Sequence, residues 1–201
     1  MLRVLGRATS GNVQKVLFLL EELGIPYQRE DYGRQFNNTQ DAAYLGLNPN
    51  GKVPTLVDGD VVIWESNTIL RYLATKHGAT ALYPADPTQR SQVERWMDWQ
   101  LASLNTPYLG IFKEAKKPVG ERGPSWDADA KELKAQLDIL EKGTSGRAFL
   151  AGKDLSLADI CLAPIVHRCL DFPVDLPGLA GVRGWREKMA GRAAFKKATA
   201  S

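Results

Sequence analysis

The chain has 201 residues, of which 44% are hydrophobic and 24% are charged, and its formal net charge is +3. A chain of this size buries a substantial core without disulfides, either as one large domain or as two of ordinary size. The small excess of positive charge forms no basic track interleaved with aromatic residues, which argues against a nucleic-acid partner. No apolar run approaches the length of a membrane span, which argues against a membrane-embedded protein.

The cysteines and histidines indicate a reduced protein without a metal. Cys161 and Cys169 lack Cys-x-x-Cys spacing, so we expect buried thiols rather than a bridge or a metal site. His77 and His167 are far apart, which argues against a histidine metal site. Met1 is followed at once by a strand-like segment, with no basic and apolar leader before it. We therefore expect a cytoplasmic location.

Residues 1–78 alternate short strands with amphipathic helices. Apolar residues at positions 13, 16, 17 and 20 follow helical spacing, and this first helix is expected to end near Gly24 and Pro26. A crossover through it makes the first two strands parallel, while the tight Asp58-Gly59 turn makes the last two antiparallel. The expected elements are a strand over 2–5, the first helix, a strand over 27–32, a helical turn over 41–47, strands over 53–57 and 61–64, and a helix over 67–77.

Pro54 lies at the head of the strand expected over 53–57. A proline within a central strand deletes a ladder hydrogen bond, so it belongs at a strand start or at an edge. An ordinary strand-opening proline would be trans, whereas a cis Val53-Pro54 bond would turn the chain sharply and let the preceding peptide face a ligand. The surrounding pattern favours the cis form, with Lys52 adding a cation beside the Val53 backbone.

Glu65 and Ser66 stand between the hairpin and the helix that follows it. The start of a helix offers free backbone N–H groups and the positive end of the helix dipole. We expect this position to suit a carboxylate on a small ligand.

From residue 87 onward the strand signals end and long helical periods follow. A short connecting segment over 79–86 separates the two patterns, so we expect domains over 1–78 and 87–201. Ser156 and Asp159 can form a capping box, flanked by Leu155 and Ile160 as a hydrophobic staple. The helices are expected over about 88–116, 125–142, 156–170 and 179–197.

Three motifs together resemble those of the cytosolic glutathione transferases, and the resemblance extends over essentially the whole chain. They are Val53-Pro54-Thr55-Leu56, Glu65-Ser66 at the start of the next helix, and Gly152 with the Ser156 to Asp159 capping box. The resemblance implies an α/β thioredoxin-like N-terminal domain, an all-α C-terminal domain, and a homodimer. It also implies a glutathione site: Glu65 and Ser66 on the γ-glutamyl end, the Val53 backbone at the cis-Pro54 loop pairing with the cysteinyl part, and Lys52 near the glycyl carboxylate.

The residue that activates the glutathione thiol would lie between the first strand and the first helix. The classes that this chain resembles, theta, delta and some bacterial ones, use serine there, so Ser10 is the leading candidate, with Thr9 and Asn12 as alternatives. Ser10 or Asn12 can equally serve only as a helix cap. The segment contains neither tyrosine nor cysteine, so we expect deprotonated glutathione, not a protein thiol, to be the nucleophile.

The resemblance implies a detoxification enzyme in which the glutathione thiolate attacks a small apolar electrophile. Tyr108 and Phe112 are candidates for the wall of the second-substrate pocket, followed by Trp96 and Trp99. Aromatic residues at helical spacing more often serve as core packing. Two alternative functions remain: glutathione-dependent reduction of disulfides or peroxides, and a non-catalytic binding or assembly module on the same fold.

Overall fold

The computed structural model describes residues 1–200, and these form two compact units. The first unit comprises residues 1–83 together with the C-terminal segment from residue 190, and the second comprises residues 84–189. Within residues 1–200, none of the helices combines the length and the apolar character needed to cross a bilayer.

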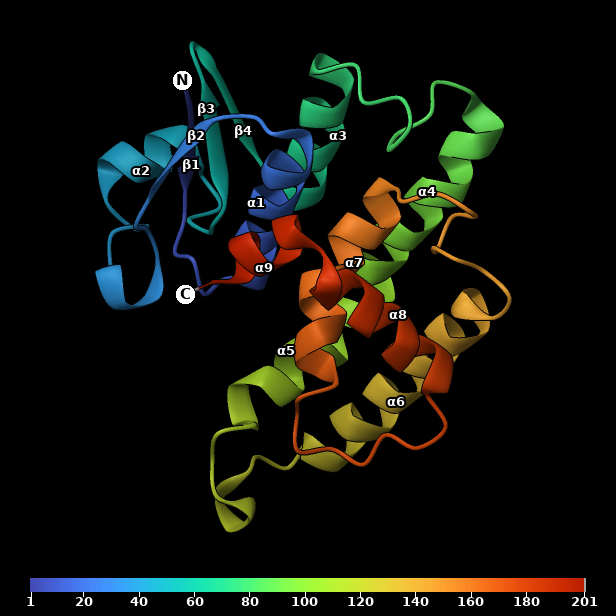
Figure 1. The fold of residues 1–201 in the computed structure, drawn as a ribbon. Helices are drawn as coiled ribbons and strands as arrows, with labels where there is room; N and C mark the ends of the chain where they lie inside the picture. Colours follow the sequence, from blue (N-terminus) through green and yellow to red (C-terminus); the bar gives the residue numbers. More distant parts are fainter. Residues whose placement is uncertain (201) are drawn as a thin grey trace. The chain divides into compact units, whose positions relative to one another are not determined.

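The first unit contains a mixed four-stranded sheet in the order β2-β1-β3-β4 (Figure 1). β1 pairs in parallel with β2, as the crossover predicted, and β3 pairs antiparallel with β4, as the Asp58-Gly59 turn predicted. β1 also pairs antiparallel with β3. Gly59 has a φ of 62°, which a glycine adopts without steric cost. The strands are β1 (Leu2–Leu5), β2 (Tyr27–Glu30), β3 (Thr55–Asp58) and β4 (Val61–Trp64).

Helices enclose this sheet, with α2 on one side of the strands and α1 and α3 on the other (Figure 1). The apolar face of α1 predicted from its spacing is buried, since Val13, Val16 and Leu20 are each 0% exposed. α1 ends at Gly24, which has a φ of 64° and caps the helix as predicted. The helices of this unit are α1 (Gly11–Leu23), α2 (Ala42–Leu47), α3 (Ser66–Lys76) and α9 (Ala193–Thr199), with a 3₁₀ turn at Arg34–Phe36.

The single helix predicted over 179–197 is wrong. The segment forms two helices, α8 (Ala180–Gly191) and α9, because Arg192 has extended backbone angles of φ −71° and ψ 136°. α9 packs against α1 within the first unit, where Phe195 meets Phe18. The strand predicted from residue 53 likewise begins two residues later, at Thr55, because the chain first turns through Pro54.

In the described part of the second unit, the regular secondary structure is helical apart from one isolated β-bridge between Phe149 and Gly152, and loops connect the helices. α7 is buried along nearly its whole length, which agrees with its nearly uniform apolar sequence. The helices are α4 (Pro87–Trp99), a π-helical turn (Gln100–Leu104), α5 (Asn105–Glu114), a 3₁₀ turn (Val119–Glu121), α6 (Trp126–Thr144), α7 (Leu157–Cys169) and α8.

The predicted capping box opens α7. The Ser156 backbone N–H donates to Asp159 Oδ2 at 3.0 Å, and the Ser156 hydroxyl donates to the same oxygen at 3.0 Å. Asp159 Oδ1 accepts from the Leu150 N–H at 3.0 Å and from Trp185 Nε1 at 2.9 Å. The box therefore also connects α7 to α8 and to the loop before α7.

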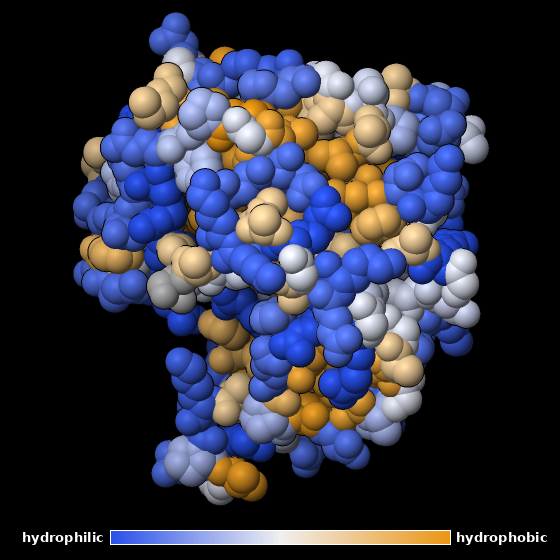
Figure 2. Space-filling view, viewed as in Figure 1, coloured by the Kyte–Doolittle hydropathy of each residue, from blue (hydrophilic) through white to orange (hydrophobic). Residues whose placement is uncertain are grey.

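Hydrophilic residues predominate on the face of the protein drawn in Figure 2, and hydrophobic residues form smaller patches between them. This mixture agrees with a composition in which 24% of the residues are charged. Cys161 and Cys169 are both free and buried, as predicted.

Candidate functional site

The Val53-Pro54 peptide bond is cis, which confirms the prediction from its sequence context. Two buried side chains hold the peptide that precedes it. The Lys52 carbonyl accepts from Tyr44 Oη at 2.6 Å and from Asn48 Nδ2 at 2.7 Å. Thr55 Oγ1, on the far side of the proline, lies 2.9 Å from Tyr44 Oη and accepts from Asn48 Nδ2 at 3.0 Å. The loop is thus fixed at both ends by the same two side chains.

Tyr44 is 2% exposed and its ring stacks on Tyr32 with centroids 5.0 Å apart. Burial raises the pKa of the Tyr44 phenol above its usual range, so Oη keeps its proton. That proton is directed to the Lys52 carbonyl, and Oη in turn accepts from Thr55.

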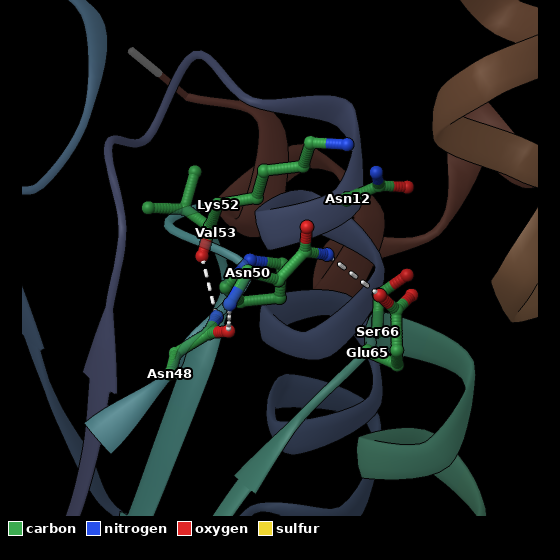
Figure 3. Close-up of a pocket in the computed structure, with 8 residues that line it drawn as sticks. Asn12, Asn48, Asn50, Lys52, Val53, Glu65 and Ser66 are labelled. Atoms are coloured by element: carbon green, nitrogen blue, oxygen red, sulfur yellow. Dashed lines mark hydrogen bonds between the residues drawn. The ribbon is translucent and has the colours of Figure 1, made fainter. Parts of the chain in front are cut away.

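The junction between β4 and α3 has an unusual backbone. Glu65 has a φ of 69°, in the left-handed region that non-glycine residues rarely adopt. This turn leaves the Glu65 side chain exposed, where its Oε1 accepts from Asn50 Nδ2 at 3.2 Å. Ser66, 3% exposed, is the first residue of α3, and Figure 3 shows Glu65 and Ser66 next to each other at this helix start.

These elements surround an open cavity of about 310 Å³. This volume includes solvent space at the open mouth of the cavity. Its wall contains the five residues predicted for glutathione and one of the three candidates for thiol activation (Figure 3). The lining residues are Asn12, Asn48, Asn50, Lys52, Val53, Pro54, Glu65 and Ser66.

Sequence reasoning missed Asn48 and Asn50 as members of the site. The Asn50 backbone N–H donates to Asn48 Oδ1 at 3.0 Å, so both asparagines shape the turn before the cis-proline. Their signal was present in Asn48-Pro49-Asn50-Gly51, which predicts a turn but not which side chains face a ligand.

The three candidates for thiol activation lie in different surroundings. Ser10 is the N-cap residue of α1, is 7% exposed, and is not among the residues that line the cavity. Thr9 is exposed and also lies outside the lining. Asn12 lines the cavity, and its Oδ1 is buried without a hydrogen-bond partner in the described residues. A buried polar atom without a partner commonly marks a place where a ligand or water completes the site.

The candidates for the second-substrate pocket belong to the second unit, and none of them is among the residues that line this cavity. Tyr108 and Phe112 of α5 form a cluster with Phe172, with ring centroids 5.8 to 6.4 Å apart. Trp96 and Trp99 meet edge to face with centroids 5.4 Å apart, so these two pack on each other. Sequence reasoning did not include Phe172, which follows α7 without helical spacing.

The cavity wall holds oxygen and nitrogen donors with no cluster suited to a metal. Among residues 1–200, no three His, Cys, Asp or Glu side chains lie close enough together to hold a metal ion. The chemistry available at the wall is an ammonium group, a carboxylate, a hydroxyl, amides and a helix N-terminus.

Comparison with known proteins identifies the family. Residues 9–76 match the model of the glutathione S-transferase N-terminal domain, and residues 106–193 match that of the C-terminal domain. Glutathione S-transferase GstB of Escherichia coli K12 is 34% identical over 98% of this chain and 97% of its own length. Glutathione S-transferase 4 of Zea mays is 32% identical over 97% of this chain and 90% of its own.

Solved structures agree with these matches. The theta class glutathione S-transferase of Xanthomonas axonopodis pv. citri, solved with glutathione bound, has a TM-score of 0.93 and 32% identity, covering 100% of this chain and 97% of its own. A glutathione S-transferase of Pseudomonas fluorescens has a TM-score of 0.86 and 31% identity, with 96% of each chain covered. The predicted fold, the predicted enzyme class and glutathione as co-substrate are confirmed. With family models matched in both halves and relatives that align over its whole length, the chain belongs to the glutathione S-transferase family.

Proposed function

We propose that this transferase binds glutathione in the cavity beside cis-Pro54 and adds its thiolate to a small apolar electrophile. One observation carries the assignment: Lys52, Val53, Glu65 and Ser66 share one cavity wall. Glutathione has an ammonium group and a carboxylate at its γ-glutamyl end, a central thiol, and a carboxylate at its glycyl end. The wall offers a group of complementary chemistry for each charged end of this tripeptide.

At the γ-glutamyl end, the Glu65 carboxylate binds the ammonium group and the start of α3 binds the carboxylate. Ser66 is the first residue of α3, and the first backbone N–H groups of α3 have no partner within the helix and form the positive end of its dipole. Asn50 donates to Glu65 Oε1 and so orients the carboxylate. At the other end, the exposed Lys52 ammonium group binds the glycyl carboxylate.

The Val53 backbone pairs with the cysteinyl part in the manner of an added strand. Tyr44 and Asn48 support this contact, because both donate to the carbonyl of the preceding residue, Lys52. The tripeptide thus lies between a fixed loop and the start of a helix.

We assign Asn12 as the residue that contacts the sulfur of glutathione. A free thiol has a pKa of about 8.5, and lowering it by about two units requires about 2.7 kcal/mol of thiolate stabilisation. The amide of Asn12 lies at the cavity, at the N-terminus of α1, so an N–H donor and a helix dipole act on the same anion. Ser10 is the N-cap residue of α1 by position, but its side chain makes no capping hydrogen bond and does not line the cavity, so we assign it a supporting role.

The reaction is a nucleophilic substitution or a conjugate addition. The thiol proton leaves to solvent, and sulfur donates its electron pair to an electrophilic carbon. In a substitution the leaving group departs with the electrons of the broken bond. We further propose that Tyr108, Phe112 and Phe172 bind the apolar electrophile, because they form a compact aromatic cluster.

Conjugation of glutathione with a general aromatic halide tests the assignment. We expect Asn12→Ala to raise the pKa of the bound thiol and lower kcat about a hundredfold, with Ser10→Ala and Thr9→Ala each losing less than about tenfold. A larger loss of kcat in Ser10→Ala than in Asn12→Ala would assign activation of the thiol to Ser10. Product analysis separates the reductase alternative, since a thioether signals conjugation and oxidised glutathione signals reduction.

We also propose a homodimer, a cytoplasmic location and a role in detoxification. The two free, buried cysteines support a reducing compartment. The measured mass in solution tests the oligomeric state, because a monomer at micromolar concentration would contradict it.

A further inference from the structure

Lys15 is fully buried, with 0% of its surface exposed. Lysine is among the residues least often buried, because removing an ammonium group from water has a large free-energy cost. Lys15 lies on α1 three residues after Asn12, so both side chains lie on the same face of the helix, about 4.5 Å apart along its axis. A buried ammonium group therefore lies one helical turn behind the cavity wall.

Lys15 Nζ donates to Asn67 Oδ1 at 3.3 Å. Asn67 is 2% exposed and directly follows Ser66, so it is the second residue of α3. α1 contributes Asn12 to the cavity, and α3 contributes Ser66. The hydrogen bond therefore joins the two helices whose first turns form the wall, beneath the position where we assign the γ-glutamyl carboxylate.

The charge of Lys15 and the dipole of α3 have the same sign at this point. The N-terminus of α3 carries a partial positive charge, and the buried ammonium group of Lys15 adds to it. A carboxylate bound at this helix start is attracted by both. Two positive groups that act on one bound anion increase the affinity for that ligand.

We propose that Lys15 is a positioning residue that, through Asn67, sets the start of α3 for the γ-glutamyl carboxylate and supplies buried positive charge to it. This inference rests on the proposed function, which assigns that carboxylate to Ser66. Lys15 touches no reacting atom, so its effect falls on glutathione affinity and not on the chemical step.

The test compares two ligands on three proteins. The ligands are glutathione and its analogue that lacks the γ-glutamyl α-carboxylate, and the proteins are wild type, Lys15→Met and Lys15→Arg. We expect Lys15→Met to lower the affinity for glutathione about tenfold and the affinity for the analogue less than about twofold. Lys15→Arg keeps the charge and should recover glutathione affinity to within about threefold of wild type.

Asn67→Ala provides a second route should Lys15→Met fold poorly, since it removes the acceptor of this hydrogen bond and keeps Lys15. We expect about threefold weaker glutathione binding, again with little effect on the analogue. Val16→Ala is the matched control, because Val16 is 0% exposed on the same helix. It should lower the melting temperature and change the two affinities equally, by less than about twofold.

Two results overturn the inference. One is a Lys15→Met or Asn67→Ala protein that binds glutathione as tightly as wild type. The other is an equal loss of affinity for both ligands, which would show a merely structural role. Failure of wild type to bind glutathione at millimolar concentration would instead defeat the proposed function, so the two failures are distinguishable.

Discussion

Phe18 of α1 and Phe195 of α9 meet edge to face, with ring centroids 5.3 Å apart and planes at 85°. Both are buried, at 0% and 2% exposure, although 177 positions separate them in the chain (195 minus 18). Arg192 forms an ion pair with Glu22 beside this contact. The last helix is therefore part of the core of the first unit.

Replacing Phe195 with alanine should lower the free energy of unfolding by about 3–5 kcal/mol, because it opens a cavity against Phe18. Lys197→Ala is the matched control on the same helix. The Lys197 side chain is 71% exposed and pairs with Glu21, so its loss should change the free energy by less than about 1 kcal/mol. Denaturant titration of both variants measures the difference, and equal values would show that α9 contributes no core packing.

The contact between Phe18 and Phe195 illustrates the difference between what local sequence patterns predict and what they do not. β1 and β4 were predicted to the residue, because alternation and the Asp58-Gly59 turn are local signals. The break at Arg192 was missed because apolar positions continue through it, and the low helix propensity of Gly191 is a weak signal. The contact of Phe195 with Phe18 joins residues far apart in the chain, and no local sequence pattern predicts it.

Asp159 accepts four hydrogen bonds from buried donors, and its removal should be among the most damaging substitutions in the second unit. Asp159→Ala leaves those donors without an acceptor, at about 1–3 kcal/mol each, so we expect a loss of at least about 3 kcal/mol. Asp159→Asn should also destabilise, since its NH₂ group would face two donors. Thermal unfolding of both variants measures the effect, and a wild-type melting temperature in either would contradict it.

His167 should make stability depend on pH. Burial, followed by the charge of Arg186, lowers the pKa of His167, although Asp171 opposes the shift. Arg186 Nε donates to His167 Nδ1 at 3.0 Å, which requires that nitrogen to be unprotonated. The folded-state pKa therefore lies below the unfolded value of about 6.5, so the stability that the neutral ring contributes is present above about pH 6.5 and is lost as the pH falls through the folded-state pKa.

The free energy of unfolding should consequently be lower at about pH 5 than at about pH 8. His167→Gln keeps an acceptor for Arg186 but cannot titrate, so it should reduce this difference. Denaturant titrations at the two pH values compare the proteins, and an unchanged difference in the variant would assign the dependence to other groups.

The cavity shows what sequence patterns can and cannot supply. The position of Glu65 and Ser66 at a helix start predicts a carboxylate site there, and the family resemblance adds the γ-glutamyl end of glutathione. A proline at a strand start is ordinarily trans, so the cis form of Pro54 was predicted from the surrounding pattern. The surroundings of Ser10 and Asn12 could not be predicted, because both types of side chain cap helices equally well. Only the path of the first turn of α1 determines which side chain lines the cavity.

Tyr44→Phe should weaken glutathione binding without changing the chemical step. The variant keeps the ring that stacks on Tyr32 but loses the hydroxyl that donates to the Lys52 carbonyl and accepts from Thr55. That carbonyl retains Asn48 as a donor, so we expect a loss of about 1–2 kcal/mol in stability and a severalfold rise in the KM for glutathione, with kcat nearly unchanged. Tyr27→Phe is the control, because its hydroxyl donates to Glu21 away from the cavity lining. It should lower stability but leave the KM unaltered, and an equal rise in both variants would show that the Tyr44 network does not position the cis-proline loop.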